Sequence, residues 1–441
     1  MASPPRLHVV TFGCQMNKLD SEAVAGQLLE RGYVPVEEAG EADVVLIHTC
    51  SVRRHAEDKV WSLLGTLRRH KERRPGLVVA VAGCMAQRER EAILERMPHV
   101  DVVCGTMELP RLPGLIAAAR EGRGPALAVA QRPDVRVPRI VPRRPSRFQA
   151  YVAVMRGCDN FCSYCVVPYV RGREHSRPPD EIEDEVRRLA DDGCKEVTLL
   201  GQNVNSYGRS LGDGLTLAGL LRRLAPIGGL ERLRFVTSHP KDATDELFQA
   251  MADLPPVCPY LHMPAQAGSN RVLRDMHRRY TREYYLERVA ALRQRVPGAE
   301  VAGDFIVGFP GETEDEFEQT LDLVGRVEYL NCFVFKYSPR PGTRAAEMAD
   351  DVPWETKRER NRRLLAVQEA IMARHQAAFV GRTVRVLVEG PSKRDPDNLT
   401  GRTPGNRIVA FPGEAKLAGE MVDVEVVDST PLTLLGRRRE G

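Results

Sequence analysis

The stretch MRGCDNFCSYC, residues 155–165, holds the closest-spaced cysteines of the chain and decides which fold we expect around it. Cys158, Cys162 and Cys165 follow the spacing CxxxCxxC. Three thiolates this close together can bind three irons of a 4Fe–4S cluster, which leaves the fourth iron open to a small molecule. A zinc site is the alternative, but no fourth cysteine or histidine follows at zinc-finger spacing. The stretch therefore predicts a cluster with one open corner.

The residues around this stretch alternate strand-like and helix-like patterns. The expected strands are 148–155, 196–200, 233–236, 259–263, 300–307 and 331–337. The expected helices include 179–190, 281–296, 313–327 and 354–379. Six strand–helix units are too few for a closed eight-stranded barrel, so they predict an open, partial (β/α)6 barrel. The cysteines would lie at the carboxyl end of its first strand, where such folds build active sites.

The first 125 residues predict a separate α/β domain with a parallel sheet. The expected strands are 7–12, 43–47, 78–82 and 100–103, and the helices 21–31, 56–70 and 87–97. Cys14, Cys50 and Cys84 each end a strand, so the sheet can bring the three thiols to one edge. They predict a second 4Fe–4S cluster, although three independently buried cysteines are the alternative. The remaining cysteines, which we interpret as structural, are Cys104, Cys194, Cys258 and Cys332.

The end of the chain and one internal segment differ from both domains. Five short β-like runs between residues 381 and 435 predict a small antiparallel β-barrel of the OB-like kind. Residues 131–147 contain four prolines and six arginines against one acid, which predicts a linker that could also serve as a basic strap on RNA. The predicted domains are therefore 1–130, 148–377 and 378–441, with the linker at 131–147.

The overall composition limits the class of protein. The chain has 441 residues, a net charge of +4 and 10 cysteines. It shows no secretory signal and no apolar run long enough to span a membrane, so we expect a cytoplasmic protein without a membrane partner. In that reducing compartment the cysteines are expected to be thiols or metal ligands.

The CxxxCxxC loop resembles that of the radical S-adenosylmethionine superfamily. The resemblance implies that the open iron binds S-adenosylmethionine and that an electron cleaves it to a 5′-deoxyadenosyl radical. It also implies cofactor contacts at Tyr164, beside the adenine, and at two strand ends. These are the turn Gly201, Gln202 and Asn203, and the pair Ile306 and Gly308 in DFIVGFPGE (304–312), although turn geometry could also explain the glycines.

Three further stretches resemble the amino-terminal motifs of methylthiotransferases within this superfamily. They are GCQMN (13–17), TCSVR (49–53) and GCMAQ (83–87), and the carboxyl-terminal barrel corresponds to that family's TRAM domain. His48 is a departure, because the family usually has asparagine there. Other stretches resemble the branch that makes 2-methylthio-isopentenyladenosine in tRNA: 157–177, 199–208, 235–242, 260–286 and 399–409.

The resemblance implies a reaction at position 37 of tRNA, beside the anticodon. Radical hydrogen abstraction from the adenine would be followed by sulfur insertion and methyl transfer, with two 4Fe–4S clusters and S-adenosylmethionine as cofactors. The expected partners are the tRNA anticodon stem-loop, an electron donor and a sulfur donor, and the chain is expected to be a monomer. The arginines expected to contact RNA are Arg143, Arg144, Arg171, Arg173, Arg402 and Arg407, and Arg278 and Arg279 could join them.

Three alternatives stay open at this point. A sister branch would act on threonylcarbamoyl-adenosine in tRNA or on an aspartate of a ribosomal protein. A radical methyltransferase would need one cluster only. A non-catalytic iron–sulfur module would bind RNA without cleaving the cofactor.

Overall fold

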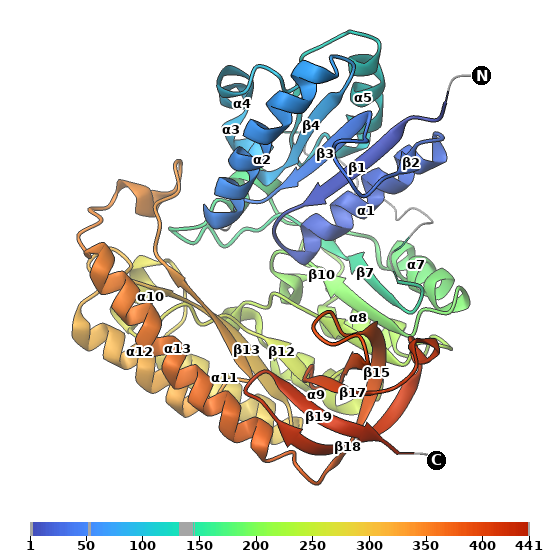
Figure 1. Ribbon diagram of the computed structural model, residues 1–441. Coiled ribbons are helices and arrows are strands. Elements are labelled where there is room, and N and C mark those ends of the chain that lie inside the picture. The colour runs from blue at the N-terminus through green and yellow to red at the C-terminus, as the bar shows by residue number, and fades with distance from the viewer. Residues whose placement is uncertain (1–2, 52–53, 132–143, 145, 440–441) are drawn as a thin grey trace.

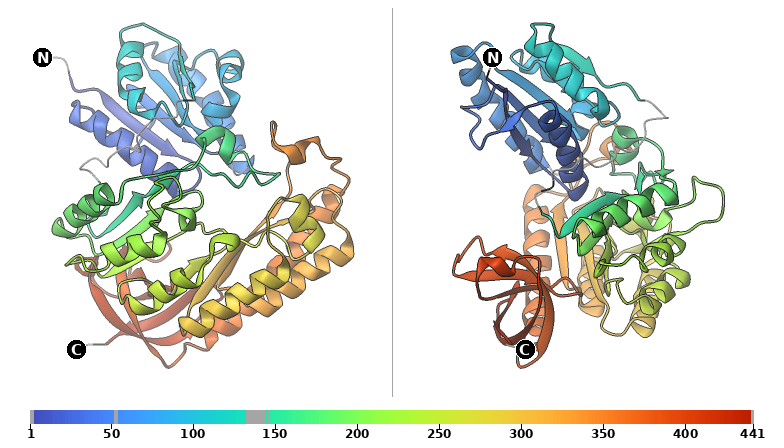
Figure 2. Two further views of the ribbon diagram at one scale, coloured as in Figure 1. Left: turned by 180° about the vertical axis from the view of Figure 1, so that it is seen from behind. Right: turned by 90° about the vertical axis from the view of Figure 1, so that its right-hand side faces the viewer.

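The structure is a computed structural model that describes residues 3–51, 54–131, 144 and 146–439. It consists of an amino-terminal α/β domain, a central half-open barrel and a small carboxyl-terminal barrel (Figure 1). The first and last of these lie at opposite ends of the central domain (Figures 1 and 2). Most of the predicted linker lies outside the described residues. In the described part of the chain, no helix is both long and apolar enough to cross a membrane.

The amino-terminal domain is built on a six-stranded parallel sheet in the order β2-β1-β3-β4-β5-β6. Its strands are β1 (Arg6–Thr11), β2 (Val34–Pro35), β3 (Val44–Thr49), β4 (Val78–Gly83), β5 (Val102–Cys104) and β6 (Ala126–Ala128). Its helices are α1 (Gln15–Glu30), α2 (Arg54–Arg73), α3 (Cys84–Glu89), α4 (Glu91–Arg96) and α5 (Leu112–Arg120), with the short 3₁₀ helix η1 (Leu109–Arg111). The predicted parallel sheet is confirmed.

The two central strands explain why this sheet forms. Every residue of β3 and β4 is buried, because helices cover both faces and form a separate apolar core on each. The expected helix 87–97 is instead split at Arg90, whose positive φ of 50° ends α3 and begins α4. The edge strands β2 and β6 were not predicted, because two or three residues carry no recognisable alternation.

The central domain contains the six expected parallel strands as two hydrogen-bonded groups of three. They are β7 (Gln149–Ala153), β10 (Glu196–Leu200), β11 (Arg232–Phe235), β12 (Tyr260–His262), β13 (Glu300–Val307) and β14 (Asn331–Lys336). Backbone hydrogen bonds of Leu233 with Pro256 and Cys258 connect the groups. Among the described residues, β7 and β14 share no ladder, so the predicted partial (β/α)6 barrel is confirmed.

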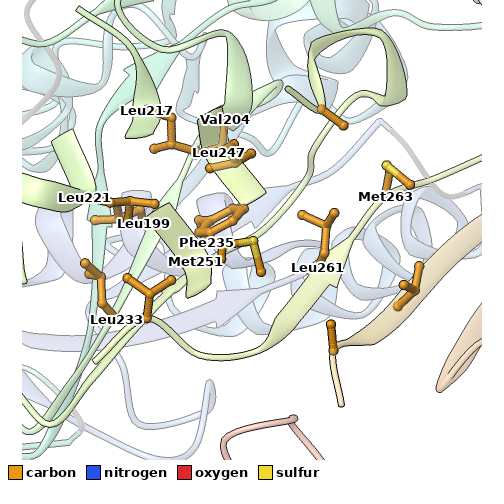
Figure 3. Packing of buried hydrophobic residues seen from close by; sticks show 14 of the residues in the cluster. Leu199, Val204, Leu217, Leu221, Leu233, Phe235, Leu247, Met251, Leu261 and Met263 are labelled. Carbon is orange, nitrogen blue, oxygen red and sulfur yellow. The ribbon is translucent and has the colours of Figure 1, made fainter. Parts of the chain in front are cut away.

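The outer face of the curved sheet is covered by helices (Figure 2). They are α7 (Pro179–Asp191), α8 (Leu217–Leu224), α9 (Asp245–Asp253), α10 (Asn270–Asp275), α11 (Arg282–Arg295), α12 (Glu314–Val327) and α13 (Trp354–Ala377). Figure 3 shows Leu199, Phe235 and Leu261 of three successive strands in the same apolar cluster as Leu217 of α8 and Met251 of α9. The smaller elements are α6 (Val167–Arg171), the hairpin β8 (Met155–Arg156) and β9 (His175–Ser176), and the 3₁₀ turns η2 (Val204–Ser206), η3 (Pro240–Asp242) and η4 (Arg344–Glu347).

The carboxyl-terminal barrel is closed in the order β15-β16-β17-β19-β18. Its elements are β15 (Thr383–Pro391), β16 (Asn398–Arg402), β17 (Ile408–Pro412), η5 (Ala415–Leu417), β18 (Met421–Ser429) and β19 (Thr433–Arg438). The pairing is antiparallel as predicted except between β17 and β19, which are parallel. This pair closes the barrel, because β19 turns back from β18 and fills the gap beside β17.

The carboxyl-terminal barrel is fixed to the central domain by buried arginines of β11. Arg234 donates to the carbonyl oxygens of Thr403 and Pro404, both at 2.8 Å, and to the Glu196 carboxylate at 2.9 Å. Arg232 donates to the carbonyl oxygens of Arg402 and Arg385. These hydrogen bonds join backbone carbonyls of β15, of the end of β16 and of the turn after it to the central domain.

Candidate functional site

Cys158, Cys162 and Cys165 lie in the loop between β8 and α6. Gly157 precedes them with φ +73°, and a Cβ atom there would come within 1.9 Å of the Arg173 carbonyl oxygen, so only glycine fits. Cys158 and Cys162 are buried, at 8% and 9% exposure. The Cys165 amide donates to the Cys162 carbonyl at 3.0 Å, which keeps the loop compact. We call these three residues the loop trio.

A buried arginine faces the loop trio. Arg278 donates from Nη1 to the Cys162 sulfur at 3.3 Å, from Nη2 to the Pro264 carbonyl at 2.9 Å and from Nε to the Tyr280 hydroxyl at 3.0 Å. Burial raises the pKa of Cys158 to about 11, against the opposing effects of a backbone hydrogen bond and of Arg278. Burial likewise raises the pKa of Cys165 to about 12. Without a metal these thiols keep their protons, so binding iron must displace them.

Cys14, Cys50 and Cys84 follow β1, β3 and β4, which are neighbours in the parallel sheet. Cys14 caps α1, Cys50 directly follows β3, and Cys84 begins α3. A Cβ atom on Gly13 would lie 2.5 Å from the Cys50 Cβ and 2.8 Å from its sulfur, so the first two loops touch. We call these three residues the sheet trio.

Polar side chains tie the three loops of the sheet trio together. The Asn17 amide donates to the carbonyl oxygens of Phe12 at 2.8 Å and Thr49 at 2.9 Å. Arg171 of α6 donates from Nε to the Cys84 sulfur at 3.3 Å. Burial raises the pKa of Cys84, and the Arg171 charge opposes that rise. Each trio thus combines two buried cysteines and one half-buried cysteine with one arginine N–H directed at sulfur, which fits iron–sulfur ligation.

His48, the residue expected to depart from the family pattern, is fully buried beside the sheet trio. Its Nε2 lies 3.7 Å from the Asp20 carboxylate. Burial lowers the pKa of His48 to about 4, so the ring is neutral at physiological pH. A Cβ atom on Gly83 would come within 2.9 Å of the ring, so the imidazole packs directly against the backbone before Cys84.

A cavity of about 750 Å³ lies between the amino-terminal domain and the barrel mouth. Cys165 of the loop trio and Ser51, the neighbour of Cys50, both line it. The other lining residues are Arg54, His55 and Asp58 of α2, Tyr164, Val166 and Val167 of the cysteine loop, Gln266, Asp304 and Ile306 of the barrel, and Val334–Arg340, Asp350, Trp354 and Lys357 near α13. The cavity therefore reaches from one trio to the edge of the other.

The structure separates the expected cofactor contacts into two groups. Tyr164 and Ile306 line the cavity, and Gly308 lies at the end of β13 with φ +69°, where a Cβ atom would collide with Lys357. The turn at Gly201 is not among the described lining residues; a Cβ atom on Gly201 would come within 2.6 Å of Met155. Nearby, Asn203 donates to Asp242, and a buried oxygen of Gln202 has no partner in the described part of the chain.

The arginines expected to contact RNA have different surroundings. Arg171 and Arg407 are buried at 8% and 4% exposure, and Arg407 is paired with Glu300, so both side chains are engaged within the protein. Arg278 is buried against Cys162 rather than lying along RNA. Arg173 is exposed beside Asp159, Arg402 is half-buried beside Glu389, and Arg144 is half-buried with its pKa lowered by burial. Arg143 lies outside the described residues.

The sequence did not point to three residues near the trios. Asn17 could have been found, because it lies one helical turn after Cys14. Arg340 pairs with Glu57 at 3.0 Å across the domain interface, and Lys357 lies over Gly308; neither carries a local signal. In the described residues, no three His, Cys, Asp or Glu side chains are arranged to hold a single metal ion.

Comparison with known proteins adds three family matches and close relatives. The models match at residues 6–105 (uncharacterized protein family UPF0004), 152–324 (radical SAM superfamily) and 377–437 (TRAM domain). The chain is 49% identical to the tRNA-2-methylthio-N(6)-dimethylallyladenosine synthase of Moorella thermoacetica, over 98% of both chains. It is 47% identical to the protein of the same name from Syntrophomonas wolfei, over 98% of this chain and 97% of that one.

Solved structures share the fold at low identity. One is the radical S-adenosylmethionine methyltransferase TsrM from Kitasatospora setae, with cobalamin and a [4Fe-4S] cluster bound. Its TM-score is 0.57 at 16% identity, over 78% of this chain and 74% of that one. Another is the cobalamin-dependent S-adenosylmethionine radical enzyme OxsB, with a TM-score of 0.52 at 12% identity, over 83% of this chain and 56% of that one.

Proposed function

This chain belongs to the family of tRNA-2-methylthio-N(6)-dimethylallyladenosine synthases, and we propose that it adds a methylthio group to that isopentenylated adenosine at position 37 of tRNA. The reaction belongs to radical S-adenosylmethionine chemistry, in keeping with the family model over residues 152–324. The sister branches are disfavoured, because the two relatives named above carry the name of this branch at 49% and 47% identity over nearly the whole chain.

The two trios are the groups that would hold the iron. The loop trio would hold the cluster that binds S-adenosylmethionine, and the sheet trio would hold a second one. When bound, the first cluster supplies the electron that cleaves S-adenosylmethionine, and the second supplies sulfur for the methylthio group. Buried thiols suit this task, because exclusion of water protects both the metal and a carbon radical.

Side chains lining the cavity would orient the cofactor and the base. Tyr164 and Ile306 would pack against the adenosine part of S-adenosylmethionine beside the loop trio. The target adenine would enter the same cavity from a single-stranded anticodon loop, which can present a base without melting a helix. The aromatic rings of Phe335 and Trp354 in the lining offer surfaces for the base and its apolar substituent.

One observation carries this proposal. A single cavity is lined by Cys165 of the loop trio and by Ser51 next to Cys50 of the sheet trio. An adenine in this space would lie between the place where hydrogen is removed and the place where sulfur is supplied. A methyltransferase with one cluster, or a module that only binds RNA, needs no such connection.

The partners follow from the reaction. The substrate is tRNA, and the TRAM domain, together with Arg143, Arg144, Arg173 and Arg402, would contact its anticodon stem-loop. An electron donor and a sulfur donor are required by the chemistry. We further propose that the chain acts as a monomer in the cytoplasm.

Mass spectrometry of tRNA nucleosides tests the proposal directly. Anaerobically reconstituted protein is incubated with isopentenylated tRNA, reductant, sulfide and S-adenosylmethionine, and we expect 2-methylthio-isopentenyladenosine together with 5′-deoxyadenosine. Cys104→Ala is the control for variants that lack a cysteine of the sheet trio, because Cys104 ends β5 in the same sheet but belongs to neither trio. Methylation without sulfur insertion, or tRNA binding without 5′-deoxyadenosine, would refute the proposal.

A further inference from the structure

Arg171 belongs to the central domain, but its guanidinium lies among residues of the amino-terminal domain. It donates from Nε to the Cys84 sulfur at 3.3 Å, and from Nη2 to the Asp20 carboxylate at 2.8 Å and to Asn17 Oδ1 at 2.9 Å. Its side chain is 9% exposed, and so is that of Asp20. A positive charge from one domain is therefore buried against a thiol of the other.

The chain segment that carries Arg171 also carries the loop trio. Helix α6 begins two residues after Cys165 and ends at Arg171. Val166 and Val170 on this segment pack against Cys84 in a small apolar cluster. The Thr106 hydroxyl of the amino-terminal domain donates to the Val170 carbonyl. The helix that carries the guanidinium is thus fixed to the amino-terminal domain by apolar packing and a hydrogen bond, as a residue that tunes a neighbouring group requires.

The surroundings of Arg171 determine its electrical effect on the sheet trio. Charges interact more strongly in a buried, low-dielectric site than in water. An N–H donated to a cysteine sulfur withdraws negative charge from it, and such hydrogen bonds help to set the potential of an iron–sulfur cluster. The Asp20 carboxylate pairs with Arg171 and also lies 3.7 Å from His48 Nε2, so it partly offsets the arginine.

We propose that Arg171 is a positioning residue through which the barrel's cysteine loop raises the reduction potential of the cluster on Cys14, Cys50 and Cys84. This inference rests on the proposed function, because it requires that the sheet trio holds a cluster. The hydrogen bond to Cys84 makes the reduced form easier to reach, and Asp20 limits that effect. The two sites are thereby coupled, since any movement of α6 changes both.

The test is a redox titration followed by electron paramagnetic resonance on the full-length, anaerobically reconstituted protein. It is carried out in the wild type and in a background with Cys158, Cys162 and Cys165 replaced by alanine, so that only the sheet trio contributes. Asp20→Asn should shift the midpoint of this cluster upward, because Arg171 then acts without its counter-charge. Arg171→Met combined with Asp20→Asn should shift it downward, because the hydrogen bond to Cys84 is lost.

The expected size is at least a tenfold change in the ratio of reduced to oxidised cluster at a fixed potential, which is about 59 mV for one electron. Arg171→Lys keeps the positive charge but not the hydrogen bonds to Cys84, Asp20 and Asn17 together. The midpoint of this variant should therefore lie between those of the wild type and the double variant. Arg171→Lys also replaces the double variant if that protein does not fold. Arg68→Gln, at a position with 71% side-chain exposure, is the control and should leave the midpoint unchanged.

Two results would overturn the inference, and they can be told apart. If the background variant binds no iron, the second cluster of the proposed function fails and this inference fails with it. If all variants bind about four irons but share one midpoint, or shift in the same direction, Arg171 has only a structural role and the proposed function stands.

Discussion

The two cysteine trios reach similar surroundings by opposite routes. The loop trio lies in one short stretch after β8, so its geometry depends on local backbone conformation. The sheet trio is collected from the ends of β1, β3 and β4, so it exists only because the parallel sheet places those ends side by side. The comparison teaches that one kind of site can be encoded either in a motif or in a topology.

The arginine beside each trio differs in the same way. Arg278 reaches Cys162 from another part of the same central domain. Arg171 reaches Cys84 across the boundary between two domains. The loop trio is therefore complete within its own domain, whereas the sheet trio is complete only when the domains are docked.

The largest expected effect separates the chemical roles of the trios. Cys158→Ala should reduce cleavage of S-adenosylmethionine to the uncatalysed background, a loss of at least about 10⁶-fold. Cys50→Ala should leave some cleavage but eliminate the methylthio product, because the loop trio is intact. Chromatography of 5′-deoxyadenosine and of tRNA nucleosides measures both. If both variants lost all iron equally, the division of roles between the trios would be wrong.

The next effect concerns the glycines that the two routes require. Gly13 and Gly157 both have positive φ, at +116° and +73°, and a Cβ atom at either position would collide with neighbouring atoms. Alanine at either should cost about 1 to 3 kcal/mol of local strain and remove iron from one trio only, from about eight to about four irons per chain. Iron analysis measures the loss. Lost cleavage of S-adenosylmethionine then identifies the loop trio as the damaged site, and lost sulfur insertion identifies the sheet trio.

Gly228→Ala is the control for this pair, because a Cβ atom there would meet nothing within 4 Å. Full iron content in Gly13→Ala would show that the sheet trio tolerates movement of its first loop. In that case the geometry of the sheet trio would depend less on the parallel sheet than proposed here.

A smaller effect follows from the buried thiols of the loop trio. The pKa of Cys158 is raised by burial from its ordinary 9.0 to about 11. Between these values the unfolded metal-free chain releases a proton that the folded chain keeps, so stability is retained below pH 9 and lost as pH rises toward 11. The slope is about 1.4 kcal/mol per pH unit for one group.

Urea unfolding of the metal-free protein at pH 8 and pH 10 measures this loss. Cys158→Ala should become less sensitive to pH by this amount. Cys104→Ala should flatten the slope as well, because burial also raises the pKa of Cys104 in the other domain. A Cys158→Ala variant with an unchanged pH slope would mean that this thiol is more accessible to water than its packing indicates.

The smallest effect concerns the arginines outside both trios. Arg143, Arg144, Arg173 and Arg402 remain as the proposed phosphate contacts, because Arg171, Arg278 and Arg407 are buried. With about four contacts, log affinity for tRNA should fall with log salt at a slope of about −3 to −4, and Arg173→Gln should reduce that slope by about 1. Filter binding over a range of salt concentrations measures both. A slope unaffected by Arg173→Gln would remove this residue from the RNA surface.

The sequence predicted the fold well where patterns are local or repeated. Long buried strands such as β3, β4 and β13 carry clear apolar runs, and the spacing of Cys158, Cys162 and Cys165 is itself a motif. The short edge strands β2 and β6 and the parallel pairing of β19 have no such signal, since they depend on what lies beside them.

Side-chain roles were harder to predict, for the same physical reason. Arg171, Arg278 and Arg407 are indistinguishable in sequence from arginines on the surface, but each is buried against a specific partner. The cavity could not be predicted either, because its lining combines α2 with residues near α13 that are far apart in the chain. The presence of an arginine in the sequence does not specify whether its side chain will contact water, RNA or a thiol.

The attachment of the carboxyl-terminal barrel by Arg232 and Arg234 has a geometric consequence. Because these arginines hold the backbone of β15 and of the turn after β16 against β11, the barrel cannot pivot freely on α13. If RNA binds to this barrel as proposed, it would be held at a fixed distance from the cavity. That distance would then decide which nucleotide enters the cavity, and a stem-loop lengthened by one base pair would present the wrong position.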